Sequence, residues 1–253
     1  MKLIFDERFC ESGYAQDNAA MPGRMEAAMS KLWDGGWDIV PAIPATLDQL
    51  LLAHDATYVT QVAQDPPRFS MARLAAGGAI LAAQYGHGGE PAFACVRPPG
   101  HHASRAEAWG HCTFSNLALS LLALRSEQKI ESAFVVDIDA HTGDGTRKVL
   151  ESWPEAIVFN PFASDAAEYL ELIEARLGDL DHTDILAVSA GFDTYRLDVG
   201  HKLDTADFAS IGRLIHKAAL RLCQGRRFAV LEGGYYLPDL GANVAAFCQG
   251  FAE

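Results

Sequence analysis

The side chains best suited to chemistry lie between residues 137 and 145. Asp137, Asp139 and His141 alternate along the chain directly after the apolar run 133–136. Alternate side chains of an extended strand share a face, so these three groups would point the same way. Two carboxylates and an imidazole can bind a divalent metal, and catalytic Zn²⁺ sites keep one coordination position open for water. A polar strand end whose acids merely cap helices would explain the same residues, so the other motifs must decide.

A second motif is a pair of adjacent histidines, His101 and His102, directly after a rigid Pro-Pro-Gly turn. A carboxylate beside an imidazole fixes its tautomer and raises its basicity. Asp137 and Asp144 are the acids available for this purpose. The pattern is typical of histidines that transfer protons.

Two more motifs follow apolar runs further along the chain. Asp193 comes after Gly191 and can complete a metal site with Asp139 and His141. Tyr235 follows two glycines, and its phenol can donate a hydrogen bond to an oxyanion. Each motif taken alone fits ordinary packing, but four such motifs at equivalent positions indicate one site.

The pattern of elements predicts how these motifs meet. Short apolar runs predict strands at 2–5, 37–40, 92–96, 133–138, 156–159, 185–189 and 228–232. Helical patterns between them cover 22–33, 56–64, 69–84, 115–126, 145–152, 166–177, 205–223 and 241–248. Apolar strands separated by helices predict an α/β fold with a parallel sheet buried on both faces, in a single domain spanning 1–253. Ligands of such sheets bind at the carboxyl ends of the strands, where all four motifs lie.

Composition narrows the class of protein. The 253 residues carry a formal net charge of −13, with 33 acidic against 20 basic residues. That balance argues against binding to nucleic acid and favours cationic small molecules or lysine-bearing peptides. No long apolar segment or signal-peptide core is present, so we expect a cytoplasmic protein without a membrane partner. The five scattered cysteines predict neither a disulfide framework nor a cysteine zinc site.

Four blocks of sequence show a resemblance to a known family. R-P-P-G-H-H-A, D-I-D-A-H-T-G-D-G, S-A-G-F-D and L-E-G-G-Y occur in this order. They resemble the signature blocks of the zinc-dependent histone deacetylases, a family that includes bacterial acetylpolyamine amidohydrolases. The resemblance runs from residue 71 to residue 236 and implies an arginase-like α/β sandwich. It also implies one Zn²⁺ per chain, bound by Asp139, His141 and Asp193.

The remaining roles come from the same resemblance. His101 would pair with Asp137 and stay largely cationic, whereas His102 would pair with Asp144 and act as the general base. The resemblance makes two further assignments, the catalytic tyrosine to Tyr235 and the glycine of the acyl-lysine channel to Gly110. The implied reaction is hydrolysis of an acylated amine, such as an acetylpolyamine or an acyl-lysine, with acetyl as the expected acyl group.

The chain departs from the family in three places. His111 follows Gly110 where the family usually has an aromatic wall residue, and only the short loop 64–68 precedes the helix predicted at 69–84. The strand at 156–159 also runs almost directly into the next helix, without the usual long loop. We therefore expect a shallow, open pocket. A second subunit of a homo-oligomer could rebuild its missing wall, and the sequence does not decide this.

Potassium is a separate question. Asp137 and the backbone near Asp139 and His141 match the family's inner K⁺ site. The serine that usually completes that site is not evident, so the sequence argues against K⁺ without excluding it.

Two other functions compete with zinc-dependent deacylation. A ureohydrolase with two manganese ions shares the fold and begins its motif like Asp139-Ala140-His141, but Gly143 interrupts that motif and the paired histidines are foreign to it. A catalytically idle metal-dependent binding module would keep the fold without the reaction. Metal analysis distinguishes the ureohydrolase, with two manganese ions per chain, from the deacylase, with one zinc. A hydrolysis assay distinguishes the idle binding module from the deacylase.

Overall fold

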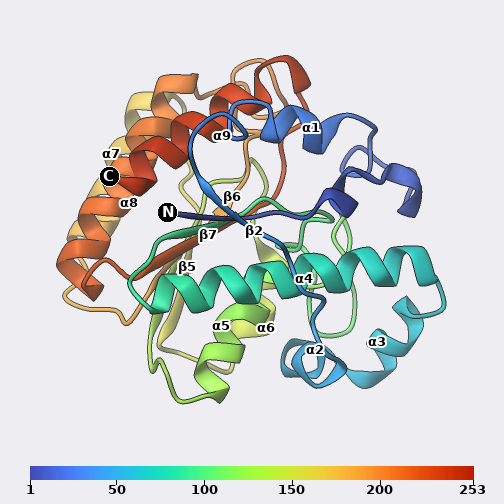
Figure 1. Ribbon diagram of the computed structural model, residues 1–253. Coiled ribbons are helices and arrows are strands. Elements are labelled where there is room, and N and C mark those ends of the chain that lie inside the picture. The colour runs from blue at the N-terminus through green and yellow to red at the C-terminus, as the bar shows by residue number, and fades with distance from the viewer.

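The computed structural model describes residues 1–253 and has three layers, with a parallel sheet between two groups of helices (Figure 1). The sheet has seven strands in the order β2-β1-β3-β7-β6-β4-β5. The strands are β1 (Lys2–Ile4), β2 (Asp38–Val40), β3 (Ala92–Ala94), β4 (Ala133–Asp137), β5 (Ala156–Phe159), β6 (Leu186–Ala190) and β7 (Arg227–Leu231). Every neighbouring pair is parallel, which confirms the predicted α/β class.

The helices cover the two faces of the sheet as separate groups (Figure 1). One group consists of α1 (Arg24–Met29), α7 (Ala166–Gly178), α8 (Thr205–Cys223) and α9 (Leu237–Ala252). The other consists of α2 (Leu47–Ala53), α3 (Ala56–Val62), α4 (Pro66–His87), α5 (Asn116–Ser126) and α6 (Asp144–Leu150). Two short 3₁₀ helices, Glu7–Cys10 and Ser12–Tyr14, follow β1. No helix combines the length and the apolar character needed to cross a membrane.

Two local predictions need correction on the α4 side. The segment 64–68 is not simply a loop, because α4 already begins at Pro66. Asp65 caps this helix by accepting a hydrogen bond from the Arg68 N–H, and prolines are tolerated in a first turn because they need no hydrogen-bond donor there. Helix α2 was missed altogether; its start is a capping box formed by Thr46 and Gln49.

The four central strands explain where the polar motifs meet. Every residue of β3, β7, β6 and β4 is buried, whereas the edge strands β2 and β5 are partly exposed. These four strands are consecutive neighbours in the sheet although they are far apart in the sequence. Their carboxyl ends therefore lie side by side, and the four motifs that follow them share one edge of the sheet.

Candidate active site at the carboxyl ends of four strands

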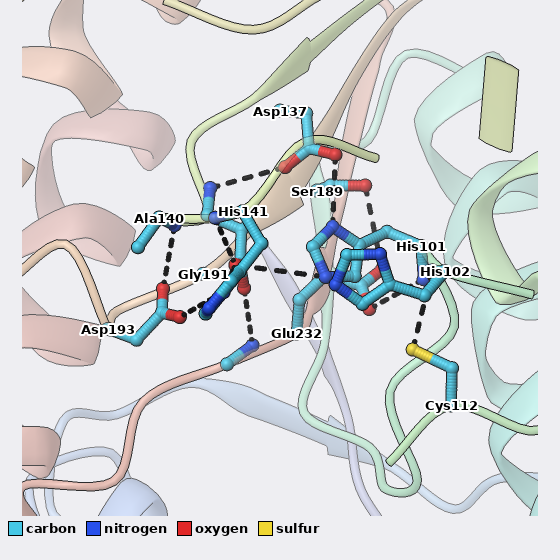
Figure 2. Close-up of polar contacts among 12 residues, drawn as sticks. His101, His102, Cys112, Asp137, Ala140, His141, Ser189, Gly191, Asp193 and Glu232 are labelled. Atoms are coloured by element: carbon cyan, nitrogen blue, oxygen red, sulfur yellow. Dashed lines mark hydrogen bonds and ion pairs between the residues drawn. The ribbon is translucent and has the colours of Figure 1, made fainter. Parts of the chain in front are cut away.

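Asp139, His141 and Asp193 form the candidate metal site. Figure 2 shows the side chains of His141 and Asp193 next to each other. His141 Nδ1 lies 3.0 Å from Asp139 Oδ1 and 3.1 Å from Asp193 Oδ2. All three potential ligand atoms lie within 4.8 Å of one another. Strand β4 ends at Asp137, so Asp139 and His141 lie in the loop that follows it. Asp137 does not join this cluster; its carboxylate contacts His101 instead.

Backbone amides hold the two carboxylates of this cluster in place. Asp193 Oδ1 accepts a hydrogen bond from Ala140 N at 2.9 Å, and Asp139 Oδ2 accepts one from Gly233 N at 2.9 Å. A Cβ atom at Gly233 would lie 2.6 Å from Asp139 Oδ2, so only glycine allows this approach. Asp193 Oδ2 is buried and accepts no hydrogen bond. A buried, unpaired carboxylate oxygen beside an imidazole fits a metal ligand.

The cluster attracts positive charge. The contacts of Nδ1 with the carboxylates of Asp139 and Asp193 raise the pKa of His141 to about 10. The proton held in this way occupies the place of a cation, and a divalent ion would displace it. The His141 side chain is 45% exposed, whereas the two carboxylates are buried. The cluster is thus reached from solvent on its histidine side.

The first of the paired histidines is enclosed by acids. His101 Nδ1 lies 3.2 Å from Asp137 Oδ2, and its Nε2 lies 3.7 Å from Asp139 Oδ1. Burial alone would lower the pKa of His101, but the charges of Asp139 and Asp137 together raise it well above its ordinary value. His101 is therefore a buried cation next to the metal cluster.

Glu232 is a buried residue of this site that sequence reasoning missed. Its Oε2 accepts hydrogen bonds from the N–H groups of Gly100 at 2.7 Å and His101 at 3.2 Å. It connects the end of β7 to the loop after β3 that carries both histidines (Figure 2). An acid directly after an apolar run, before two glycines, was the available signal.

The second histidine has a different environment. His102 Nδ1 lies 2.8 Å from Asp144 Oδ1, and the Trp109 indole stacks on the imidazole with 3.6 Å between ring centroids. The Trp109 N–H also donates to Asp144 Oδ2 at 3.2 Å. Burial, followed by the charge of His101, lowers the pKa of His102 to about 4. His102 is therefore neutral at pH 7, as a general base must be.

Gly110 and His111 border this histidine and the tyrosine. A Cβ atom at Gly110 would lie 2.7 Å from His102 Cδ2, and Gly110 has a φ of 57°. The His111 ring lies edge-on to Tyr235, with 5.9 Å between centroids. His111 thus takes the place of an aromatic wall residue, and its Nδ1 lies 3.9 Å from Asp17 Oδ1 in the loop before α1.

Tyr235 is positioned by two residues that the sequence did not reveal. Asp198 Oδ2 accepts hydrogen bonds from the backbone N–H groups of Tyr235 and Tyr236. The buried Arg24 donates to the carbonyl oxygen of Gly234 at 2.9 Å, and its guanidinium lies 5.3 Å from the centroid of the Tyr235 ring. Burial raises the pKa of Tyr235, so its hydroxyl stays protonated and can act as a donor.

The comparisons with known proteins agree with this architecture. The histone deacetylase domain model matches residues 19–170 and 161–251. A "probable deacetylase" of Methanothermobacter thermautotrophicus is 30% identical over 81% of this chain and 76% of its own length. The "polyamine deacetylase HDAC10" of Homo sapiens is 27% identical over 98% of this chain, which spans only 46% of that protein. The crystal structure of the HDA15 HD domain superimposes with a TM-score of 0.87 at 23% identity, covering 99% of this chain and 89% of that one.

The three-layer α/β fold and the match to the deacetylase domain identify the class of protein as a hydrolytic enzyme that acts on amides. The chain belongs to the histone deacetylase family. The predicted family and the predicted enzyme class, a deacetylase that hydrolyses amides, are confirmed. The roles assigned to individual residues stay predictions, which the geometry supports.

Proposed function

We propose that this protein is a zinc-dependent hydrolase that removes an acyl group, with acetyl as the first candidate, from a small or flexible amine. The observation that carries the proposal is that three parts lie next to one another. These parts are the metal cluster at Asp139, His141 and Asp193, the His102–Asp144 pair, and the phenol of Tyr235. The rings of His102 and His141 are 5.9 Å apart between centroids, and Gly233, two residues before Tyr235, bonds to Asp139. Metal-dependent amide hydrolysis needs each of these three parts.

The donor set suits one Zn²⁺ ion. Asp139, His141 and Asp193 offer one imidazole nitrogen and two carboxylates, with the free Asp193 Oδ2 facing the imidazole. When bound, zinc supplies Lewis acidity, which polarises a carbonyl and acidifies water. A second group of potential ligands, His101, Cys112 and Glu232, includes a thiol and a carboxylate already bonded to backbone amides. It therefore does not suit a second manganese ion, which disfavours the ureohydrolase alternative.

Three side chains have separate roles in the reaction: one transfers protons, one orients the first, and one stabilises charge. Neutral His102 takes a proton from the attacking water and later gives it to the leaving amine. Asp144 holds the imidazole in the required tautomer through its Nδ1 contact. Cationic His101 stabilises negative charge that develops beside it.

Tyr235 completes the site as a hydrogen-bond donor. Its hydroxyl makes no hydrogen bond within the protein and stays protonated because burial raises its pKa. It can therefore donate to the oxygen of the scissile carbonyl as that oxygen gains charge. The Asp198 contacts to the backbone fix the turn from which the ring projects.

The edge of the site formed by Asp17 and His111, here called the rim, favours an amine that carries a further positive charge. Asp17 lies next to His111, which borders Tyr235, and the chain as a whole carries a charge of −13. One relative is named a polyamine deacetylase, and its substrate class fits an acidic rim. An acyl-lysine segment presents the same chemistry, whereas nothing favours histones as such. A cytoplasmic location and a homo-oligomer stay predictions.

Zinc-loaded protein assayed against N-acetylputrescine, N-acetylspermidine and a short acetyl-lysine peptide tests the proposal. We expect turnover of at least one of them, with one zinc per chain by elemental analysis. Tyr235→Phe should keep the zinc and lose activity by about 10²–10³-fold. Binding without any turnover across the panel would support the idle module, and two manganese ions per active chain would support the ureohydrolase.

A further inference from the structure

Protein donors bind the backbone carbonyl groups that lead into the metal cluster. Asn160, which directly follows β5, is buried, and its Nδ2 donates to the carbonyl oxygen of Asp137 at 3.1 Å. The hydroxyl of Tyr169 in α7 donates to the next carbonyl, that of Ile138, at 3.2 Å. The segment between Asp137 and Asp139 is therefore held by side chains from two other elements.

The orientation of the Asn160 amide is fixed by Arg147. Arg147 Nη2 lies 3.2 Å from Asn160 Oδ1. A guanidinium group can only donate hydrogen bonds, so the amide oxygen must face Arg147. The amide nitrogen must then face the Asp137 carbonyl, because a flipped amide would lose both hydrogen bonds.

These residues do not fit a potassium ion at Asp137. Cations of this kind are bound by oxygen atoms, but Asn160 presents N–H groups to the carbonyl that would be a ligand. The guanidinium of Arg147 lies directly behind the amide. Lys202, whose ammonium donates to the carbonyl oxygen of Ala163, also lines the small cavity of about 60 Å³ beside Asn160 and Tyr169. Two cationic side chains therefore already occupy surroundings that K⁺ would have to share.

We propose that Asn160, oriented by Arg147, holds the strand end that carries the metal ligands in the position where the family uses a potassium ion. Asn160 is thus a positioning residue, and the metal centre of this chain is independent of monovalent cations. The inference rests on family membership and on the hydrogen bonds around Asp137, not on which amide is cleaved.

The test compares unfolding in KCl, NaCl and tetramethylammonium chloride at equal concentration, with zinc-loaded and with metal-free protein. The wild type should have the same Tm and the same zinc affinity in all three salts. Asn160→Ser replaces the amide donor by a hydroxyl oxygen and should lower Tm by about 2–4 °C in the tetramethylammonium salt. With Arg147 and Lys202 still in place, potassium should restore no more of that loss than tetramethylammonium does.

Asn18→Ser is the matched control, because Asn18 is exposed in the loop before α1 and does not contact Asp137. It should unfold like the wild type in every salt. A wild-type Tm or zinc affinity that rises specifically with K⁺ would overturn the proposal, even if Asn160→Ser does not fold. An Asn160→Ser variant with the Tm of the wild type in all three salts would overturn the role of the amide in holding the strand end. Because unfolding and zinc binding are the readouts, a protein without hydrolytic activity would contradict the proposed function and leave this test intact.

Discussion

The two adjacent histidines lie in opposite environments although one peptide bond joins them. His101 is enclosed by Asp137 and Asp139, is almost fully buried and carries a raised pKa. His102 is buried to the same extent, but its partner Asp144 is 35% exposed and Trp109 covers its ring. Burial and the charge of His101 lower its pKa to about 4. The two histidines therefore differ in charge because two buried acids stabilise the cation at His101, whereas burial and the charge of His101 keep His102 neutral.

Removing each imidazole is the strongest way to break this comparison. His102→Gln should lower kcat by about 10³-fold with zinc content and Tm nearly unchanged, because it removes the base and leaves an acid that water can reach. His101→Gln should also lower Tm, by about 10 °C, because it leaves the Asp137 carboxylate buried without its cation. Calorimetry beside a kinetic assay checks both; equal losses of Tm would contradict the division of roles.

Neutralising the two acids should show the same asymmetry on a smaller scale. Asp137→Asn should cost about 100-fold in kcat/KM, and Asp144→Asn about 10-fold. The difference follows from burial, since Asp137 is fully enclosed and water cannot take over its contact with His101. Glu151→Gln is the matched control, because Glu151 is exposed just after α6. If Asp144→Asn proved the more damaging change, the burial argument would be wrong.

The pH profile sharpens the comparison further. A base whose pKa is lowered to about 4 stays unprotonated until the pH falls well below 6.5, so the acid limb of kcat/KM should lie between those two values. The charge of a bound metal ion acts in the same direction. Trp109→Ala exposes the imidazole of His102 to water. Its pKa should then rise, and the acid limb of the kcat/KM profile should move to higher pH. A wild-type limb at 6.5 or above would show that His102 is not the titrating base.

The smallest effect should come from Trp109→Phe. Phenylalanine can keep the stacking on His102 but loses the N–H donor to Asp144. We expect a loss of about 3-fold in kcat with KM unchanged, since one neutral-to-charged hydrogen bond at an exposed position contributes little. Steady-state kinetics at saturating and limiting substrate separate the two parameters. A large rise in KM would instead assign Trp109 to substrate binding.

Local sequence patterns predicted the strands and the ends at which the site lies. Strand β5 was placed at its observed bounds, and the inner strands were placed within one or two residues of theirs. Those strands are apolar throughout, so burial on both faces and a polar strand end can be seen in a short window. The motifs and the family resemblance then predicted the metal cluster and the two histidine–aspartate pairs, His101 with Asp137 and His102 with Asp144.

What the sequence could not reveal depends on contacts between distant segments. Glu232 binds the loop at Gly100 across 132 residues, and Trp109 reaches Asp144 across 35. The Asp198 bonds to the Tyr235 turn and the Asn160 bond to Asp137 are of the same kind. No periodicity encodes such pairs, because a side chain that serves a distant backbone resembles any other polar residue in its own segment.

The order of strands in the sheet has a consequence for biosynthesis. Strand β7 is the seventh along the chain, yet it inserts between β3 and β6, and Gly233 just beyond it supplies an N–H to Asp139. A nascent polypeptide that still lacks residues 227–235 therefore has a sheet divided in two. Its Asp139 lacks the Gly233 hydrogen bond, and it has no Tyr235. Fragments that end before residue 227 likewise lack both the strand that joins the two halves of the sheet and the Gly233 N–H that holds Asp139.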